Sequence, residues 1–382
     1  MKKIFTVLLC FPVLFLNACS GIYENFREIE RLSVVDTMGI DRIPGGVKLC
    51  FAAFSLSDDE KAVLSGSGDS IETAIEQIKK RSGDRELFCR QIEYILIGEN
   101  SAKKGIDGYL AYIARSPLMR IDTPLYIVRG TEASTLIRDC DAISEVMAGV
   151  VESGAHRGDS SVTTAAEVMR NLLSRGSALI SALELAPAAD VEGEKIAAVN
   201  GCAIIKGGRL SGFLSEEQTV GAGFLTGNAG PCTLTVSDSR GGKAVLGITD
   251  GNAEVFPVWA EDGSLARVNI IASANATVDE ISGSGDLGNA AYARHLTGQL
   301  EAGVSERINS VLRLSSSLGS DFLGLGESIE KRDPERYRLL SRPFDELLPV
   351  LEVQVSVRGT INHTNDMEGG VPDIADSGRR TA

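Results

Sequence analysis

The stretch LTGQLEAGVSERINSV, residues 296–311, places an apolar side chain at every third or fourth position. This spacing is that of one face of an α-helix, with Glu301, Glu306 and Arg307 off the apolar stripe. A long helix with one such stripe usually packs on a sheet. The apolar positions are Leu296, Leu300, Val304, Ile308 and Val311.

The regions on both sides of this helix predict strands. In LEVQVSVR, residues 351–358, apolar and polar residues alternate, which predicts a strand with one buried and one wet face. Residues 196–281 are mostly strand-like, with turns around Gly207, Gly241 and Gly263. We therefore expect antiparallel strands and one long helix in the second half of the chain.

The first half alternates strands and helices, so the expected fold class is α+β, with mixed sheets and packed helices. A loop rich in Ser and Gly is expected before the first helix. The expected elements are a hairpin of residues 32–40 and 47–56, a helix from Ile71 capped by Asp69 or Ser70, a strand over 92–97, a helix over 106–113, a strand over 124–128, and helical structure over 142–183 with a break at 154–161 and a cap at Thr163 or Thr164.

A length of 382 residues predicts two or three domains. The acidic segment 187–194 has no strong periodicity and suggests a boundary near residue 195. The expected division is a signal peptide over 1–18, an N-terminal domain over 19–195 with two subregions, a C-terminal domain over 196–366, and a disordered tail over 367–382.

The first nineteen residues have the pattern of a bacterial lipoprotein signal. Lys2 and Lys3 precede an uncharged run, residues 4–16, that is about 20 Å long as a helix and too short to span a bilayer. The sequence LNAC then resembles a lipobox. The small Ala18 admits the peptidase, and the thiol of Cys19 accepts the lipid. We expect cleavage between Ala18 and Cys19 and anchoring by lipid on Cys19.

Charge and histidine content exclude several functions. The chain has 38 Lys and Arg against 52 Asp and Glu, a net charge of −14, and no dense basic stretch, which argues against nucleic acid as a partner. Loss of two lysines with the signal makes the mature charge −16. With only three histidines, far apart in the sequence, neither a His-based catalytic site nor a metal site is expected.

The cysteines do not form a disulfide or metal pattern. Five remain after the signal is removed and Cys19 is acylated, they contain no C-x-x-C pair, and several lie in apolar surroundings. Free cysteines of this kind usually pack in a core. They are Cys50, Cys89, Cys140, Cys202 and Cys232.

Other motifs have simpler structural explanations than chemistry. Residues 283–288 match G-x-G-x-x-G, but Asp286 would lie in the phosphate-binding turn and no parallel βαβ unit is expected there, so a loop is favoured. The segments 66–68 and 58–60 are interpreted as a loop and a solvated charge run. Trp259 is expected in the core. No active site is expected, and no cofactor.

Several strings in order resemble the C-subunit lipoproteins of bacterial spore germinant receptors, the GerAC type. The resemblance covers nearly the whole length, and DFLGLG followed by FDELLP is its most specific part. Gln91 and Phe224 depart from the family pattern, where His and Trp are common. The matching strings are residues 28–32, 38–41, 68–75, 85–88, 95–99, 102–106, 212–227, 321–326 and 344–349.

The resemblance implies a non-catalytic receptor subunit anchored by lipid to the outer face of the inner spore membrane. There it would assemble with the A and B membrane subunits of a nutrient receptor and trigger germination. Whether such a subunit binds the nutrient itself is left open. The alternatives are a solute-binding lipoprotein of a transporter, which needs two similar α/β lobes, and an envelope hydrolase, which needs a nucleophile and base.

Overall fold

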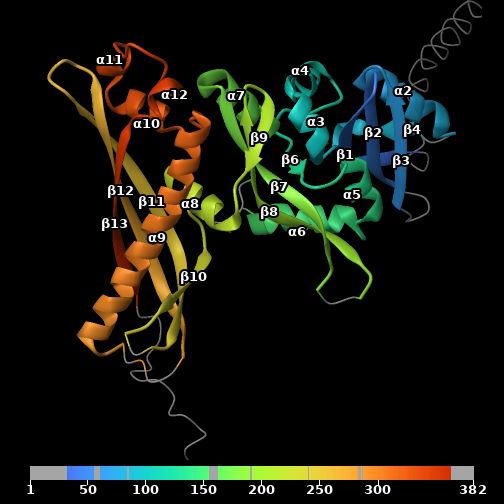
Figure 1. The fold of residues 1–382 in the computed structure, drawn as a ribbon. Coiled ribbons are helices and arrows are strands. Elements are labelled where there is room, and N and C mark those ends of the chain that lie inside the picture. Colours follow the sequence, from blue (N-terminus) through green and yellow to red (C-terminus); the bar gives the residue numbers. More distant parts are fainter. Residues whose placement is uncertain are drawn as a thin grey trace, which may run out of the picture.

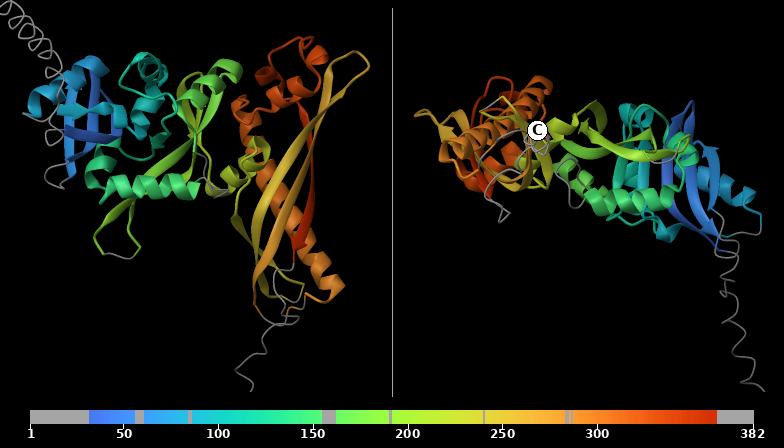
Figure 2. Two further views of the ribbon diagram at one scale, coloured as in Figure 1. Left: turned by 180° about the vertical axis from the view of Figure 1, so that it is seen from behind. Right: turned by 90° about the horizontal axis from the view of Figure 1, so that it is seen from below.

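The computed structural model describes residues 32–55, 61–83, 86–154, 162–189, 192–239, 241–282, 285 and 287–362. These residues form two parts, each built on its own sheet, and the parts lie beside each other in an elongated molecule (Figures 1 and 2). The predicted signal and lipobox with Ala18 and Cys19, the charge run 58–60, His156, His363 and the predicted tail lie outside the described residues.

The first sheet is mixed, with strand order β3-β2-β1-β5-β6-β7-β8-β9 and β4 pairing with β1. The central pairs β1/β5, β5/β6 and β6/β7 are parallel, and the hairpins at both sides are antiparallel. Its strands are β1 Leu32–Ile43, β2 Gly46–Ser55, β3 Lys61–Gly68, β4 Glu86–Phe88, β5 Tyr94–Gly98, β6 Leu125–Val128, β7 Ser177–Pro187, β8 Lys195–Lys206 and β9 Arg209–Phe213.

Helices cover both faces of this sheet, and each face has its own apolar core. The core on one face includes residues of α2, α4 and α7, and the core on the other includes residues of α5 and α6. This layering explains why the central strands β5 and β6 are buried along their whole length. The helices are α2 Ile71–Arg81, α3 Glu99–Lys104, α4 Asp107–Arg115, α5 Ala133–Asp139, α6 Ile143–Gly154 and α7 Ala165–Arg175, with a 3₁₀ turn, η2, at Cys89–Gln91.

Most expected elements of the first part are confirmed, including the hairpin β1–β2 and the cap of α2 by Ser70. The helical prediction over 142–183 is wrong beyond Arg175. There Gly176 adopts the left-handed conformation (φ +68°) and ends α7, and the following residues form β7. Pairing of β7 with β6 and β8 decides its conformation, which the local pattern cannot show.

The Gly66–Gly68 segment, expected as a loop, lies in strand β3. A Cβ atom at Gly66 would meet Ile78 and the carbonyl of Ala74, and one at Gly68 would meet the first turns of α2. The two glycines therefore allow α2 to pack directly against the backbone of β3. The local abundance of Ser and Gly reflects this close packing of a helix on a strand.

The second part has a four-stranded sheet of order β10-β11-β12-β13, with two strands of 17 residues. Helices α8 and α9 share the core of this sheet, and the long α9 crosses its face (Figure 1). The elements are α8 Glu216–Thr226, β10 Cys232–Ser237, β11 Lys243–Trp259, β12 Leu265–Ile281, α9 Ala290–Leu318, α10 Leu325–Arg332, α11 Pro334–Tyr337, α12 Phe344–Leu347 and β13 Glu352–Asn362.

The long helix and the final alternating strand are confirmed. All five apolar residues of the α9 stripe are fully buried, and alternate side chains of β13 pack against the same core. Trp259, at the end of β11, packs at the edge of this core and is half-buried. The antiparallel prediction holds for β10, β11 and β12.

Two features of the second part correct the expectations. Strand β13 runs parallel to β12, because the long α9 carries the chain back along the sheet before β13 begins. Within the region expected as mostly strand, residues 216–226 form α8, which starts with a capping box of Ser215 and Gln218. Gly221 lets α8 approach the backbone of α9.

The boundary expected near residue 195 falls in the connection between β7 and β8, which pair with each other along most of their length. The first sheet continues through β9 to Phe213. Only Leu214 and Ser215 then separate β9 from α8. In the described part of the chain, the two sheets are therefore joined at this short connection, which lies beside the candidate site.

Candidate functional site

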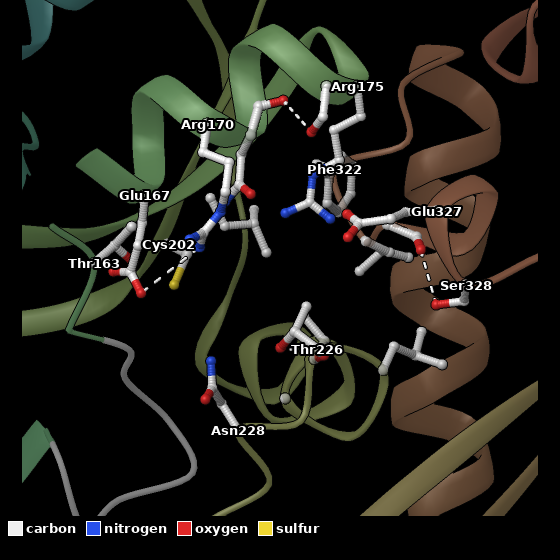
Figure 3. Close-up of a pocket in the computed structure, with 18 of the residues that line it drawn as sticks. Thr163, Glu167, Arg170, Arg175, Cys202, Thr226, Asn228, Phe322, Glu327 and Ser328 are labelled. Carbon is white, nitrogen blue, oxygen red and sulfur yellow. Dashed lines mark hydrogen bonds and ion pairs between the residues drawn. The ribbon is translucent and has the colours of Figure 1, made fainter. Parts of the chain in front are cut away.

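A cavity of about 740 Å³ lies where the two parts meet. Helix α7 and strands β7 and β8 of the first part form one wall, and α8 with α10 and the residues just before α10 forms the other (Figure 3). Most of its lining is polar or charged, and the rest includes apolar side chains such as Leu225 and Phe322. Cavities of a few hundred to a thousand cubic ångströms are typical of sites for small molecules.

Helix α7 supplies two arginines to the cavity, Arg170 and Arg175. The helix starts at a capping box, in which Thr164 and Glu167 bond each other's backbone amides, and it ends at Gly176. Arg175 is therefore the last helical residue, and its side chain is held at the junction of the two parts. Figure 3 shows both guanidinium groups directed into the cavity.

The opposite wall contains the loop DFLGLG, residues 321–326, which leads into α10. The carboxylate of Asp321 is buried and accepts hydrogen bonds from the backbone N–H groups of Leu325 (2.8 Å) and Gly326 (2.7 Å). The N–H of Asp321 donates to Oδ1 of Asp345 at 2.8 Å. These bonds join the two strings that carry the strongest resemblance into one compact structure.

Arg175 packs against this loop across the junction. Gly324 has φ +75°, a conformation that favours glycine, and a Cβ atom there would overlap Nη1 of Arg175 in its present position. Burial lowers the pKa of Arg175, and the carboxylates of Asp321 and Glu327 act in the opposite direction. The guanidinium is therefore a partly desolvated positive charge at the contact between the parts.

Burial also changes the pKa of a carboxyl group at this contact. It raises the pKa of Asp321 to about 6, although the two N–H groups and Arg175 favour the charged carboxylate. At Glu327, the hydrogen bond from Lys331 (2.7 Å) lowers the pKa. The cavity thus contains charged groups of both signs, with both arginines on the α7 wall and one carboxylate on each wall, Glu167 on α7 and Glu327 on α10.

The groups that line the cavity can bind polar ligands. The lining contains no histidine among the described residues. His295, on α9, lies outside the cavity, with Nε2 at 3.1 Å from the carbonyl oxygen of Ser237. In the ranges that the structure covers, no three His, Cys, Asp or Glu side chains come together as a metal site would require. Guanidinium, hydroxyl and amide groups remain, and these hold polar ligands.

The residues predicted from sequence to carry function, Ala18 and Cys19, precede the described residues, so lipidation stays a prediction. The five later cysteines form no disulfide among the described residues, and four of them are buried, as expected of core thiols. Cys202 lines the cavity. Sequence reasoning missed Arg170 and Arg175. The signal that could have led to them is the DFLGLG string, whose Gly324 makes room for Arg175.

Comparison with known proteins identifies the class. One family model, described as the spore germination protein N-terminal domain, matches residues 25–185, and a second, described as spore germination B3/GerAC-like, C-terminal, matches residues 200–365. Together they cover most of the chain, which belongs to the GerAC family of spore germination proteins. The segment between the matches contains the start of β8.

A solved structure, described as "Crystal Structure of the GerBC protein", has a similar fold. The TM-score is 0.57 at 17% sequence identity, and the match covers 85% of this chain and 96% of the other. At this identity the similarity supports the fold, which is α+β as expected. No curated protein sequence matches the chain. None of the described helices is long and apolar enough to cross a bilayer.

Proposed function

We propose that this protein is the non-catalytic C subunit of a spore nutrient germinant receptor. It would assemble with the A and B membrane subunits and help to trigger germination. The observation that carries the proposal is that both GerAC domains match in order along one chain. The cavity supports a binding role, because its lining includes two arginines and several hydroxyl and amide groups that can hold a polar ligand.

The alternative of a solute-binding lipoprotein is less well supported by the fold. Such proteins close two α/β lobes of similar topology around a solute. Here the first part has a mixed sheet covered on both faces, and the second has four strands with its helices packed on one core. The two parts therefore lack the similar topology that a solute-binding lipoprotein requires of its lobes.

Deleting the gene tests the proposed function. In a strain that lacks paralogous receptors, we expect loss of germination with at least one nutrient, measured as the fall in optical density and release of dipicolinate. Supplying the intact gene should restore the response. Normal germination with every nutrient would contradict a receptor role.

We further propose that Cys19 carries the lipid that holds the protein on the outer face of the inner spore membrane. A Cys19→Ala change removes the only thiol in the lipobox and should move the protein from the membrane fraction to the soluble fraction, measured by immunoblotting. Cys10→Ala is the matched control, since it changes a leader cysteine outside the lipobox. Unchanged membrane attachment of the Cys19→Ala protein would rule out lipidation as the anchor.

A further inference from the structure

The cavity contains a positive group whose hydrogen bonding is incomplete. Nε of Arg175 is buried and has no hydrogen-bond partner among the described residues. An unpaired buried donor on a cation is costly, and a guanidinium presents its donors in a planar fork that matches an oxyanion. Nε itself is closed to a solute, but Arg175 lines the cavity and its guanidinium is directed into it, so an oxyanion can reach the part of the side chain that faces the cavity.

Counted together, the charged side chains of the lining carry one more positive than negative charge. Three cations and two carboxylates line the cavity. Lys331 is paired with Glu327 at 2.7 Å. Glu167 accepts hydrogen bonds from the N–H (2.9 Å) and hydroxyl (3.1 Å) of Thr164, and it lies 3.9 Å from Arg170. Both carboxylates of the lining are therefore already engaged, and the charge of Arg175 is balanced only by Glu327 and by Asp321, which is buried behind the lining.

This local charge is opposite to that of the whole chain, which has a net charge of −14. A protein with this balance repels anions over most of its surface, so a binding site for one requires a local cluster of cations. The remaining lining offers hydroxyl and amide groups, including Thr219, Thr226 and Asn228, on the wall that α8 and the residues after it form. The hydroxyls of Thr219 and Thr226 already donate to carbonyls of α8 and Ser215, so their oxygens can accept hydrogen bonds from the uncharged portion of a solute.

We propose that this cavity binds a small polar solute through an oxyanion, a carboxylate or a phosphate, that Arg175 and Arg170 contact. The hydroxyl and amide groups of the facing wall would then contact the rest of the solute. Because α7 belongs to the first part and α8 and α10 to the second, a bound solute would touch both parts at once. Its binding would stabilise the relative position of the parts seen here.

Titration calorimetry of the full chain in detergent tests the proposal, with sodium succinate and sodium phosphate as separate probes at matched ionic strength. We expect saturable binding of at least one probe, and the preferred probe distinguishes a carboxylate from a phosphate. An Arg175→Gln change should weaken this binding about ten-fold or more, since hydrogen bonds to charged groups are the strong ones. Arg170→Gln should weaken it as well, and its side chain is exposed enough for the change to spare the fold.

Arg294→Gln is the control, because it removes an exposed arginine of α9 that does not line the cavity. It should bind the probe as the unchanged protein does. Circular dichroism of each variant separates loss of the site from loss of the fold. Two results would overturn the proposal: no saturable binding of either probe at millimolar concentration, or equal affinity in folded Arg170→Gln and Arg294→Gln proteins.

Discussion

A Phe322→Ala protein is expected to lose about 3–5 kcal/mol of its free energy of unfolding. Phe322 is fully buried, belongs to the core of the second part, and lies two residues before the glycine that receives Arg175. Removing the ring leaves a hole that the surrounding backbone cannot fill, since the adjacent Asp321 is fixed by two hydrogen bonds to the start of α10. Urea unfolding followed by circular dichroism measures the loss.

Leu339→Ala is the matched control for this change. Leu339 follows α11 in the same part of the molecule, but its side chain is 80% exposed. Truncating it should change the free energy of unfolding by about 0.5 kcal/mol or less. If the two variants unfold at the same denaturant concentration, the DFLGLG loop does not contribute to the core in the way that the structure indicates.

The second large effect concerns the pH dependence of stability and the carboxyl of Asp321. Its pKa is raised to about 6 from the ordinary 3.8. The folded chain therefore holds this proton more tightly than the unfolded chain does. The resulting stabilisation is present below about pH 4 and is lost as the pH rises through about 6. The loss in free energy of unfolding amounts to about 3 kcal/mol.

An Asp321→Asn protein isolates this contribution, because an amide cannot ionise. Asparagine also loses one hydrogen bond from the N–H groups of Leu325 or Gly326, a cost that does not depend on pH. We expect the difference in free energy of unfolding, unchanged protein minus variant, to fall by up to about 3 kcal/mol between about pH 4 and about pH 7. Other carboxyl groups are common to both chains and cancel.

Equilibrium unfolding at several pH values provides the measurement. A difference that stays constant over this range would show that the carboxyl of Asp321 titrates at its ordinary pKa, and that its burial is compensated by the two N–H groups and Arg175. A difference that rises with pH would show that these groups stabilise the charged form more than burial destabilises it.

The elements that sequence analysis predicted correctly are those whose pattern is decided locally. The stripe of α9 and the alternation in β13 each reflect one buried face, and the cap at Ser70 is set by its own neighbours. Strand β7 and the direction of β13 depend on distant partners, so local periodicity cannot reveal them. The long α9 predicts a sheet beneath it, but not which way the returning strand runs.

The candidate site is harder to predict because its two walls are far apart in sequence. Arg175 and Gly324 are separated by most of the second part, and nothing in the periodicity of either segment relates them. The string at 321–326 was recognised as a family feature. Its physical role, in which Gly324 leaves space for Arg175, can be seen only in the folded chain. Function was more accessible, because the order of the family strings survives in the linear sequence.

The connection at Leu214 has a mechanical consequence. Leu214 is fully buried, its N–H donates to the carbonyl of Cys202 at 2.7 Å, and Gly201 (φ +67°) leaves room for its carbonyl. Lys206 also donates to the carbonyl of Leu318 at 2.7 Å, so β8 contacts the end of α9. These contacts fasten the connection to both parts, so we expect a torque applied to one sheet to reach the other instead of being absorbed by a loose tether.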